Sequence, residues 1–174
     1  MKRFIDPIAN ATKILSGVSQ GCLLTTKADG QVNTMSISWG TMGIEWSKPI
    51  VTVFVRGSRH TKGLLDKNPE FTVNIPVGQI DKQIISLCGT KSGRDLDKIK
   101  ELGLTTVEPE AVSVPAIREL PLTLECRVLY AQQQLPACIK GDGVSSHYSA
   151  NGDIHDNYHT AYYAEIVSAY VIEA

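Results

Sequence analysis

The chain has 174 residues, of which 43% are hydrophobic and 20% are charged, and its formal net charge is −1. This length and composition predict one globular domain over residues 1–174. The near-neutral charge argues against nucleic acid or an anionic membrane as the main partner. No apolar run reaches the roughly 18 residues that could span a bilayer. Residues 1–7 lack the apolar core of a signal peptide, so we expect a cytoplasmic protein.

The cysteines carry little functional signal. Cys22, Cys88, Cys126 and Cys138 include no CxxC pair. Cys22 and Cys126 lie in apolar strand patterns, which favours buried thiols over a disulfide framework.

Short local signals divide the first half of the chain into strands, turns and helices. Asp6 followed by Pro7 is typical of a helix start, because proline is tolerated at the first helical position. Ala28-Asp29-Gly30 is typical of a hairpin turn. The predicted elements are a helix from Pro7 closed by Ser16-Gly17, strands at 21–27 and 32–39, a loop at 40–49, a strand at 50–56, a helix at 60–68 capped by Ser58, and a strand at 71–75.

The second half contains fewer regular elements. Apolar and polar residues alternate from Leu122 to Tyr130, which indicates a long half-exposed strand. The predicted elements are a helix at 80–87, a polar loop at 89–94, a short helix at 95–102 ended by Gly103, strands at 122–134 and 161–172, and an irregular segment between them. Many strands with a few short helices indicate a mainly β barrel with helical insertions.

Small polar side chains are concentrated on the strand at 32–39. They are Asn33, Thr34, Ser36 and Ser38, with Met35 and Trp39 as apolar neighbours. Threonine is common in strands, so the pattern fits a solvent-facing edge strand. It also fits a strand that meets the polar edge of a heteroaromatic ring such as a flavin. The residues alone leave both interpretations open.

The loop at 56–61 offers groups that suit a phosphate. Arg56, Ser58 and Thr61 lie at a predicted helix start, and Lys62 follows. A helix N-terminus presents unpaired N–H groups that favour an anion, and arginine adds a forked cationic donor. The alternative is a capped helix with solvated cations. Together with the polar strand, the loop suggests a flavin mononucleotide site.

Other chemistries have weaker signals. The loop at 89–94 is basic and contains glycine, but the chain has neither Walker A nor GxGxxG spacing. His155 and His159, near His147 and Asp153, have a spacing that could bind zinc on a helix, but Asn151 and Gly152 indicate a loop, so no metal site is predicted. No GxSxG elbow supports a hydrolase.

Taken in order, these stretches make the chain resemble the flavin reductase-like family of FMN-binding split-barrel proteins, in particular its flavoredoxin-like branch. The resemblance runs from about Gly21 to Ile172. The stretches that carry it are Asn33 to Trp39, Lys48-Pro49, Arg56 to Thr61, Glu70 to Asn74, Cys88 to Asp95, Leu124 to Cys126 and His159 to Glu165.

The resemblance implies a mainly β, Greek-key-like split barrel that forms homodimers, with FMN near the subunit interface. It implies that residues 33–38 run beside the flavin ring and ribityl chain and that Trp39 borders the ring. Arg56, Ser58 and Thr61 would hold the phosphate with Lys62, whereas Arg59 receives no role. Lys91 and Ser92 would approach the flavin from their loop. His159 would lie at the flavin or its substrate face.

Three functions fit these expectations. The first is a reductase that passes hydride from NADH or NADPH to flavin N5. The second is an FMN electron carrier of the flavoredoxin type, which would need a redox partner protein. The third is a non-flavin binding module on the same barrel, because fold does not determine function. We also expect a homodimer that covers open strand edges, with Trp46 and the strand at 161–172 as candidate interface.

Overall fold

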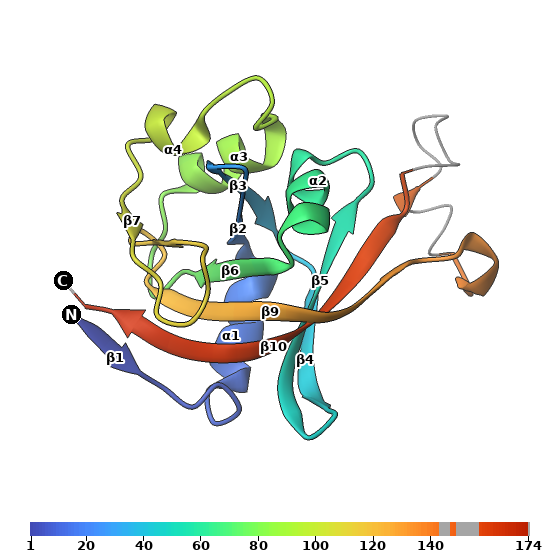
Figure 1. Ribbon diagram of the computed structural model, residues 1–174, viewed down its shortest axis with the longest axis horizontal. Coiled ribbons are helices and arrows are strands. Elements are labelled where there is room, and N and C mark those ends of the chain that lie inside the picture. The colour runs from blue at the N-terminus through green and yellow to red at the C-terminus, as the bar shows by residue number, and fades with distance from the viewer. Residues whose placement is uncertain (143–146, 149–156, 174) are drawn as a thin grey trace.

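An antiparallel sheet dominates the computed structural model, which describes residues 1–142, 147–148 and 157–173 (Figure 1). Its strand order is β3-β2-β6-β9-β10-β5-β4, and β1 also pairs with β10. The elements are β1 Lys2–Phe4, α1 Ala11–Gln20, β2 Cys22–Ala28, β3 Gln31–Ile37, β4 Gly40–Glu45, β5 Lys48–Arg56, α2 His60–Lys67, β6 Glu70–Ile75, α3 Lys82–Thr90, α4 Lys98–Glu101, β7 Thr106–Val107, β8 Ala116–Ile117, β9 Leu122–Gln133, the 3-10 helix η1 Pro136–Cys138, and β10 His159–Ile172.

The sheet closes on itself because its two end strands are consecutive in the chain. Only Ser38 and Trp39 separate β3 from β4. Three Cα–Cα steps reach at most about 11 Å, whereas six strand spacings across a flat sheet would span about 29 Å. The sheet must therefore curl until β3 and β4 approach, and they are joined there by chain instead of by a hydrogen-bonded ladder. The predicted mainly β split barrel is confirmed.

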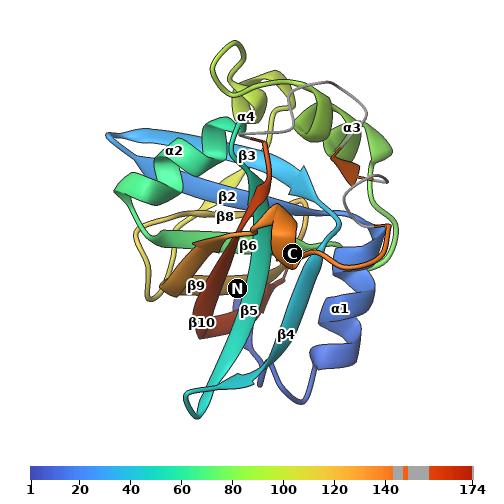
Figure 2. The same ribbon diagram turned by 90° about the vertical axis from the view of Figure 1, so that its right-hand side faces the viewer.

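The helices lie outside this barrel. Figures 1 and 2 show α2, α3 and α4 together on one side of the sheet, and α1 beside β4. Apolar residues from α1 and from strands all round the sheet form the main core, including Ile14, Val53 and Leu124. A second cluster joins Leu23 of β2 to Ile84 and Cys88 of α3. Strand β2 is therefore buried on both faces, which explains its unbroken apolar start. No helix in the described ranges is long and apolar enough to cross a membrane.

Strand β10 holds the barrel together. One edge pairs with β9 along most of its length, while the other pairs with β5 at His159–Glu165 and with β1 at Tyr170–Ile172. The strand begins two residues before the predicted start, which places His159 directly opposite Arg56 in the ladder. On the edge that faces β5 and β1, these ladders leave only residues 166–169 of β10 without a strand partner.

The predicted loop at 40–49 is wrong. Residues Gly40–Glu45 form β4, and a two-residue turn at Trp46 and Ser47 leads into β5, which starts at Lys48. The two glycines of β4 argued against a strand, but full pairing with β5 overrides that propensity. Both turn residues have positive φ angles, of 50° and 58°, as a type I′ hairpin turn requires.

Several predicted boundaries also differ. Helix α1 starts at Ala11 because the Asp6 carboxylate accepts bonds from the backbone N–H groups of Ile8 and Ala9 in a separate turn. It then continues through Gly17 to Gln20, since Ile14 and Val18 pack into the core. The predicted helix at 95–102 is reduced to α4. The predicted half-exposed pattern of β9 is wrong, because its first five residues are buried on both faces and all but one of the residues beyond them are exposed.

The cysteines agree with the sequence-based expectation. Cys22 and Cys126 are buried free thiols, as is Cys88, and Cys138 is exposed. Burial raises the pKa of Cys22 to about 12, so this thiol stays protonated. The three buried cysteines therefore act as small apolar core residues.

A buried carboxylate fastens the 110–111 segment to the sheet. Glu125 is fully buried on β9 and accepts backbone bonds from Glu110 and Ala111 at 2.8 and 2.6 Å. The Tyr170 hydroxyl donates a third bond at 2.8 Å. A buried carboxylate needs such donors, since an unpaired buried charge is strongly destabilising.

Tyr170→Phe should therefore lower the free energy of unfolding by about 1.5–3 kcal/mol, the scale of a hydrogen bond to a charged group. Urea unfolding followed by circular dichroism would measure the change. Tyr163→Phe is the matched control on the same strand, because its hydroxyl makes no hydrogen bond within the described residues. Equal stability of the two variants would show that the Tyr170 bond contributes nothing net.

Candidate functional site

Two cavities lie side by side where the barrel is split. The first, called here the indole cavity, has a volume of about 240 Å³ and is lined by residues 35–39, Phe54, Arg56, Arg59 and His159. The second, called the basic cavity, has a volume of about 120 Å³. It is lined by Asn33, Met35, residues 58–61, Cys88, Gly89, residues 91–94 and Lys98. Because Met35 and Arg59 line both, the two cavities form one cleft.

The structure brings most of the predicted site residues into this cleft. The indole cavity takes Met35, Ser36, Ser38, Trp39, Arg56 and His159, and the basic cavity takes Asn33, Met35, Ser58, Thr61, Lys91 and Ser92. Two residues lie elsewhere. Thr34 is fully buried and accepts a hydrogen bond from Thr25. Lys62 forms an ion pair with Asp66 at 2.7 Å and lines none of the cavities described here.

Positive charge gathers in the basic cavity without a compensating acid. Its cationic lining residues are Arg59, Lys91, Arg94 and Lys98, and no described lining residue is an aspartate or glutamate. Burial lowers the pKa of His60 in the same wall, and the charge of Arg94 lowers it further. The chain as a whole has a net charge of −1, so this local excess is suited to an anion.

Hydrogen bonds hold the elements of the basic cavity in place. Asn33 donates to the Thr61 hydroxyl at 2.9 Å, which ties β3 to α2. The Arg94 guanidinium donates to the Ser58 carbonyl at 3.1 Å and joins the two loops. The Ser58 hydroxyl donates to the Asn157 side chain at 2.7 Å, so the prediction that Ser58 caps α2 is wrong. Both loops are thereby fixed around the cavity.

Two glycines allow α3 and its following loop to approach β3 closely. A Cβ on Gly89 would lie 2.5 Å from the Ser36 hydroxyl oxygen, and one on Gly93 would collide with the Asn33 side-chain oxygen. A side chain at either position would displace the Ser36 or Asn33 side chain or push this segment away from the strand. The close approach places the cations of the loop beside the polar groups of β3.

The two arginines of the 56–59 segment have different positions. Arg56 donates to the His147 carbonyl at 2.9 Å, and its guanidinium lies 5.2 Å from the centre of the Tyr148 ring. It lines the indole cavity, away from Thr61. Arg59, which sequence reasoning left without a role, lines both cavities. Its place as the residue just before α2 was the signal that could have identified it.

His159 is a buried neutral imidazole at the indole cavity. Only 7% of the residue is exposed, and its ring lies 5.2 Å from that of Trp39. Burial, reinforced by the charges of Arg56 and Arg59, lowers its pKa to about 4. Its Nδ1 lies 2.6 Å from the Tyr148 hydroxyl, which itself donates to Gln134. This direction assigns the ring proton to Nδ1 and leaves Nε2 as an acceptor.

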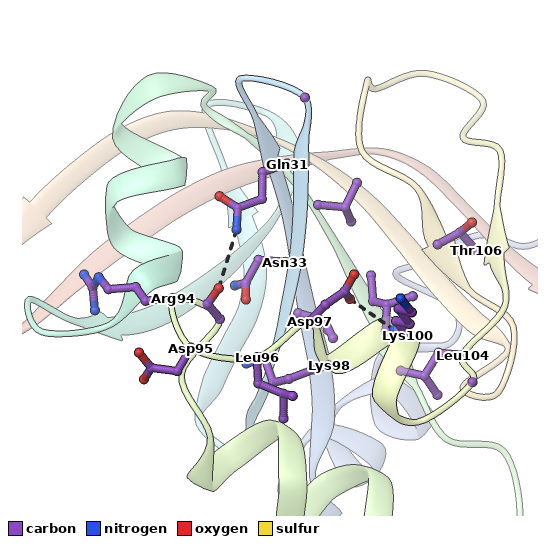
Figure 3. Close-up of a pocket in the computed structure, with 16 residues that line it drawn as sticks. Gln31, Asn33, Arg94, Asp95, Leu96, Asp97, Lys98, Lys100, Leu104 and Thr106 are labelled. Carbon is purple, nitrogen blue, oxygen red and sulfur yellow. Dashed lines mark hydrogen bonds between the residues drawn. The ribbon is translucent and has the colours of Figure 1, made fainter.

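Two further cavities adjoin the cleft. An aromatic cavity of about 450 Å³ shares Ser38, Trp39 and Phe54 with the indole cavity and adds Ile139, His147 and Tyr148 to its lining. An outer cavity of about 670 Å³ lies between β3 and the 93–106 segment (Figure 3). Asn33, Gly93, Arg94 and Lys98 line both the outer and the basic cavity. The cleft thus has an aromatic neighbour at one end and a polar neighbour at the other.

The zinc-type spacing noted in the sequence is only partly described. His155 and Asp153 lie outside the described residues, whereas His147 and His159 lie inside them. Within the described ranges, no group of three histidine, cysteine, aspartate or glutamate side chains could hold a metal ion.

Sequence relatives extend over much of the chain. An uncharacterized protein of Archaeoglobus fulgidus is 35% identical over 97 residues, which is 56% of this chain and 54% of that protein. The chain therefore spans about half the length of that relative. The uncharacterized protein YddH of Escherichia coli is 32% identical over 136 residues, covering 75% of this chain and 70% of YddH.

Solved structures share the fold. Flavoredoxin from Methanosarcina acetivorans has a TM-score of 0.66 at 25% identity, covering 88% of this chain and 68% of that one. Nitrilotriacetate monooxygenase component B from Bacillus cereus has a TM-score of 0.66 at 20% identity, covering 97% and 81%. An FMN-binding domain of a flavin reductases-like enzyme from Shewanella baltica has a TM-score of 0.66 at 16% identity, covering 98% and 77%.

The family follows from a match that covers most of the chain. Residues 16–174 match the model of the family described as flavin reductase like domain. This match includes every strand of the sheet except β1 and all the residues that line the cleft. The chain belongs to the flavin reductase-like domain family, as the resemblance of its motifs indicated.

Proposed function

We propose that this protein binds FMN in the cleft and acts as a flavin oxidoreductase, with NADH or NADPH as its reductant. The observation that carries the proposal is the pairing of a cationic, acid-free basic cavity with an indole cavity walled by Trp39 and Phe54. FMN has the same two parts, an anionic phosphate and a planar ring. The bound flavin would accept a hydride and pass its electrons on.

The phosphate would be held in the basic cavity. Arg59, Lys91 and Arg94 supply charge, and Ser92 and Thr61 supply hydroxyl groups. The Thr61 hydroxyl accepts its bond from Asn33, so its own proton remains available to an anion. The close approach allowed by Gly89 and Gly93 brings these groups together before any ligand arrives.

The ring would lie in the indole cavity. Met35, Ser36 and Ser38 line it from β3 and the connection to β4. Arg56 is held there by His147 and Tyr148, so its charge is fixed before reaction. A preorganised cation favours negative charge that develops nearby, without the cost of reorienting solvent. In this proposal Arg56 therefore lies beside the flavin ring in the indole cavity, and not beside the phosphate in the basic cavity.

The aromatic cavity supports the reductase over a simple electron carrier. It adjoins the indole cavity and is walled by Trp39, Phe54 and Tyr148, which suits a second planar group such as nicotinamide. His159 lines the adjoining indole cavity, where its Nε2 can accept a hydrogen bond. A flavoredoxin-type carrier remains the second candidate, favoured by the likeness to the Methanosarcina acetivorans flavoredoxin.

The purified protein separates these functions. A yellow protein with flavin absorbance would support FMN binding. A colourless protein that does not bind added FMN would leave the non-flavin binding module as the remaining candidate function. Anaerobic bleaching of the FMN-loaded protein by NADH or NADPH would support the reductase. Bleaching by dithionite alone would favour the carrier, whose redox partner protein stays a prediction. A single domain over residues 1–174 and a cytoplasmic location also stay predictions.

Arg59→Ala should weaken FMN binding about five- to tenfold, or roughly 1–1.4 kcal/mol. The effect is modest because the arginine is exposed and solvent screens its charge. Flavin fluorescence titration would measure the dissociation constant. Lys62→Ala is the matched control, since Lys62 pairs with Asp66 outside the cleft. If the two variants bind FMN equally well, Arg59 does not contact the phosphate.

His159→Ala should slow flavin reduction by NAD(P)H about tenfold while FMN remains bound, because a contact that positions the reductant is lost. Stopped-flow absorbance would follow the reduction. With a folded-state pKa near 4, His159 is neutral above pH 5, so the wild-type rate should show no titration near pH 6.5. A wild-type rate in the variant would assign His159 a structural role.

The lowered pKa of His159 also makes the free energy of unfolding depend on pH. Because the pKa is lowered from about 6.5, the unfolded chain binds this proton more readily. The neutral imidazole stabilises the fold fully above pH 6.5, and this contribution is lost as the pH falls towards 4. Urea unfolding of His159→Ala should consequently vary less with pH in this window than that of the wild type.

We also propose a homodimer formed through the β4–β5 hairpin. Ile44 and Trp46 are 63% and 54% exposed there. Trp46 adopts a left-handed turn conformation that a bulky side chain disfavours. Neither burial nor turn propensity within one chain explains a tryptophan at this position, whereas contact with a second copy does.

Light scattering at micromolar concentration should give twice the chain mass of 18.9 kDa. Trp46→Gly should give a monomer that folds at least as stably, because glycine relieves the left-handed strain while removing the contact. Val77→Asp is the control at an exposed apolar residue outside the hairpin. A dimeric Trp46→Gly variant would show that the hairpin tip is not the interface.

A further inference from the structure

A buried lysine stands behind the basic cavity. Lys98, the first residue of α4, is 4% exposed and lines both the basic and the outer cavity (Figure 3). Its ammonium donates to the carbonyls of Lys91 and Cys88, at 3.3 and 3.5 Å, where α3 ends. The sequence offered no sign of this residue, because a lysine between Asp97 and Ile99 is typical of a solvated helix surface.

The charge of Lys98 is not balanced by the protein. No described carboxylate lies within ion-pair distance of its ammonium. The neighbouring Asp97 instead accepts a bond from the Lys100 backbone N–H (Figure 3). Burial lowers the pKa of Lys98, and the charge of Arg59 lowers it further, although Cys88 opposes the shift. A buried charge without a partner is strongly unfavourable.

A purely structural role accounts for only part of this arrangement. The carbonyls at a helix C-terminus carry partial negative charge and do attract a cation. An ammonium has three N–H donors, however, and the two carbonyls use two of them through long bonds. The other cations of the cavity, Arg59, Lys91 and Arg94, add repulsion. An anion in the basic cavity would satisfy the third donor and neutralise the charge.

We propose that Lys98 is the buried cation that makes this site select a phosphorylated flavin over riboflavin. This role rests on the proposed FMN site, and it makes Lys98 the residue that distinguishes a flavin with a phosphate group from one without. Arg59, Lys91 and Arg94 are exposed, so water screens their charges. Lys98 is shielded, so removing its charge has the larger effect on the phosphorylated ligand.

The test compares FMN with riboflavin in Lys98→Gln. Glutamine retains N–H donors, on a side chain one atom shorter than that of lysine, but carries no charge. Fluorescence titration should show FMN affinity about 10- to 100-fold weaker, the scale of a hydrogen bond to a charged group. Riboflavin affinity should change less than about threefold. Lys100→Met is the matched control, because it removes an exposed lysine of the same helix and should leave both affinities unchanged.

The outcomes are separable. Unchanged FMN affinity in Lys98→Gln, or an equal loss for both flavins, would overturn phosphate selection by Lys98. A wild-type protein that binds neither flavin would contradict the proposed function instead. If Lys98→Gln does not fold, wild-type protein labelled with ¹⁵N-lysine decides the question. The slowly exchanging buried ammonium signal should shift with FMN and not with riboflavin, and the same response to both would count against the proposal.

Discussion

The two-residue connection between β3 and β4 is the constraint on which the rest of this structure depends. Ser38 and Trp39 join strands that stand at opposite ends of the sheet order. Because so short a link cannot span an open sheet of this width, the sheet closes into a barrel. The barrel has one unpaired seam, between β3 and β4. Backbone and side chains at such a seam stay available to a ligand. The cleft forms there, with Trp39 at its edge.

The covering elements convert this seam into a site with two chemical ends. The start of α2 and the loop after α3 bring cations beside β3, and glycines 89 and 93 allow the close approach. At the other end, β5 and β10 place Arg56 opposite His159. Desolvation makes the histidine a neutral group, while the basic cavity keeps its charge. One cleft can therefore hold an anion and a planar ring.

Much of the fold could be predicted from local pattern. Strand periodicity, turn residues and apolar runs located most strands, because these signals depend on neighbours in the chain. The motifs at 33–39, 56–61 and 88–95 identified the family and the two faces of the cleft. Strand β4 was missed because its glycines have low strand propensity, and pairing with β5 compensates for that only in the folded sheet.

The division of roles within the site needed three-dimensional information. Arg56 and Arg59 are three residues apart and look alike in sequence, yet the β5–β10 ladder places Arg56 at the indole cavity alone, whereas Arg59 lines both cavities. Thr34 sits within the polar strand but faces Thr25. Lys98 is buried because its ammonium lies against the Cys88 and Lys91 carbonyls at the end of α3. Local pattern thus specified which segments meet, whereas burial and the direction of each side chain depend on packing between segments distant in the chain.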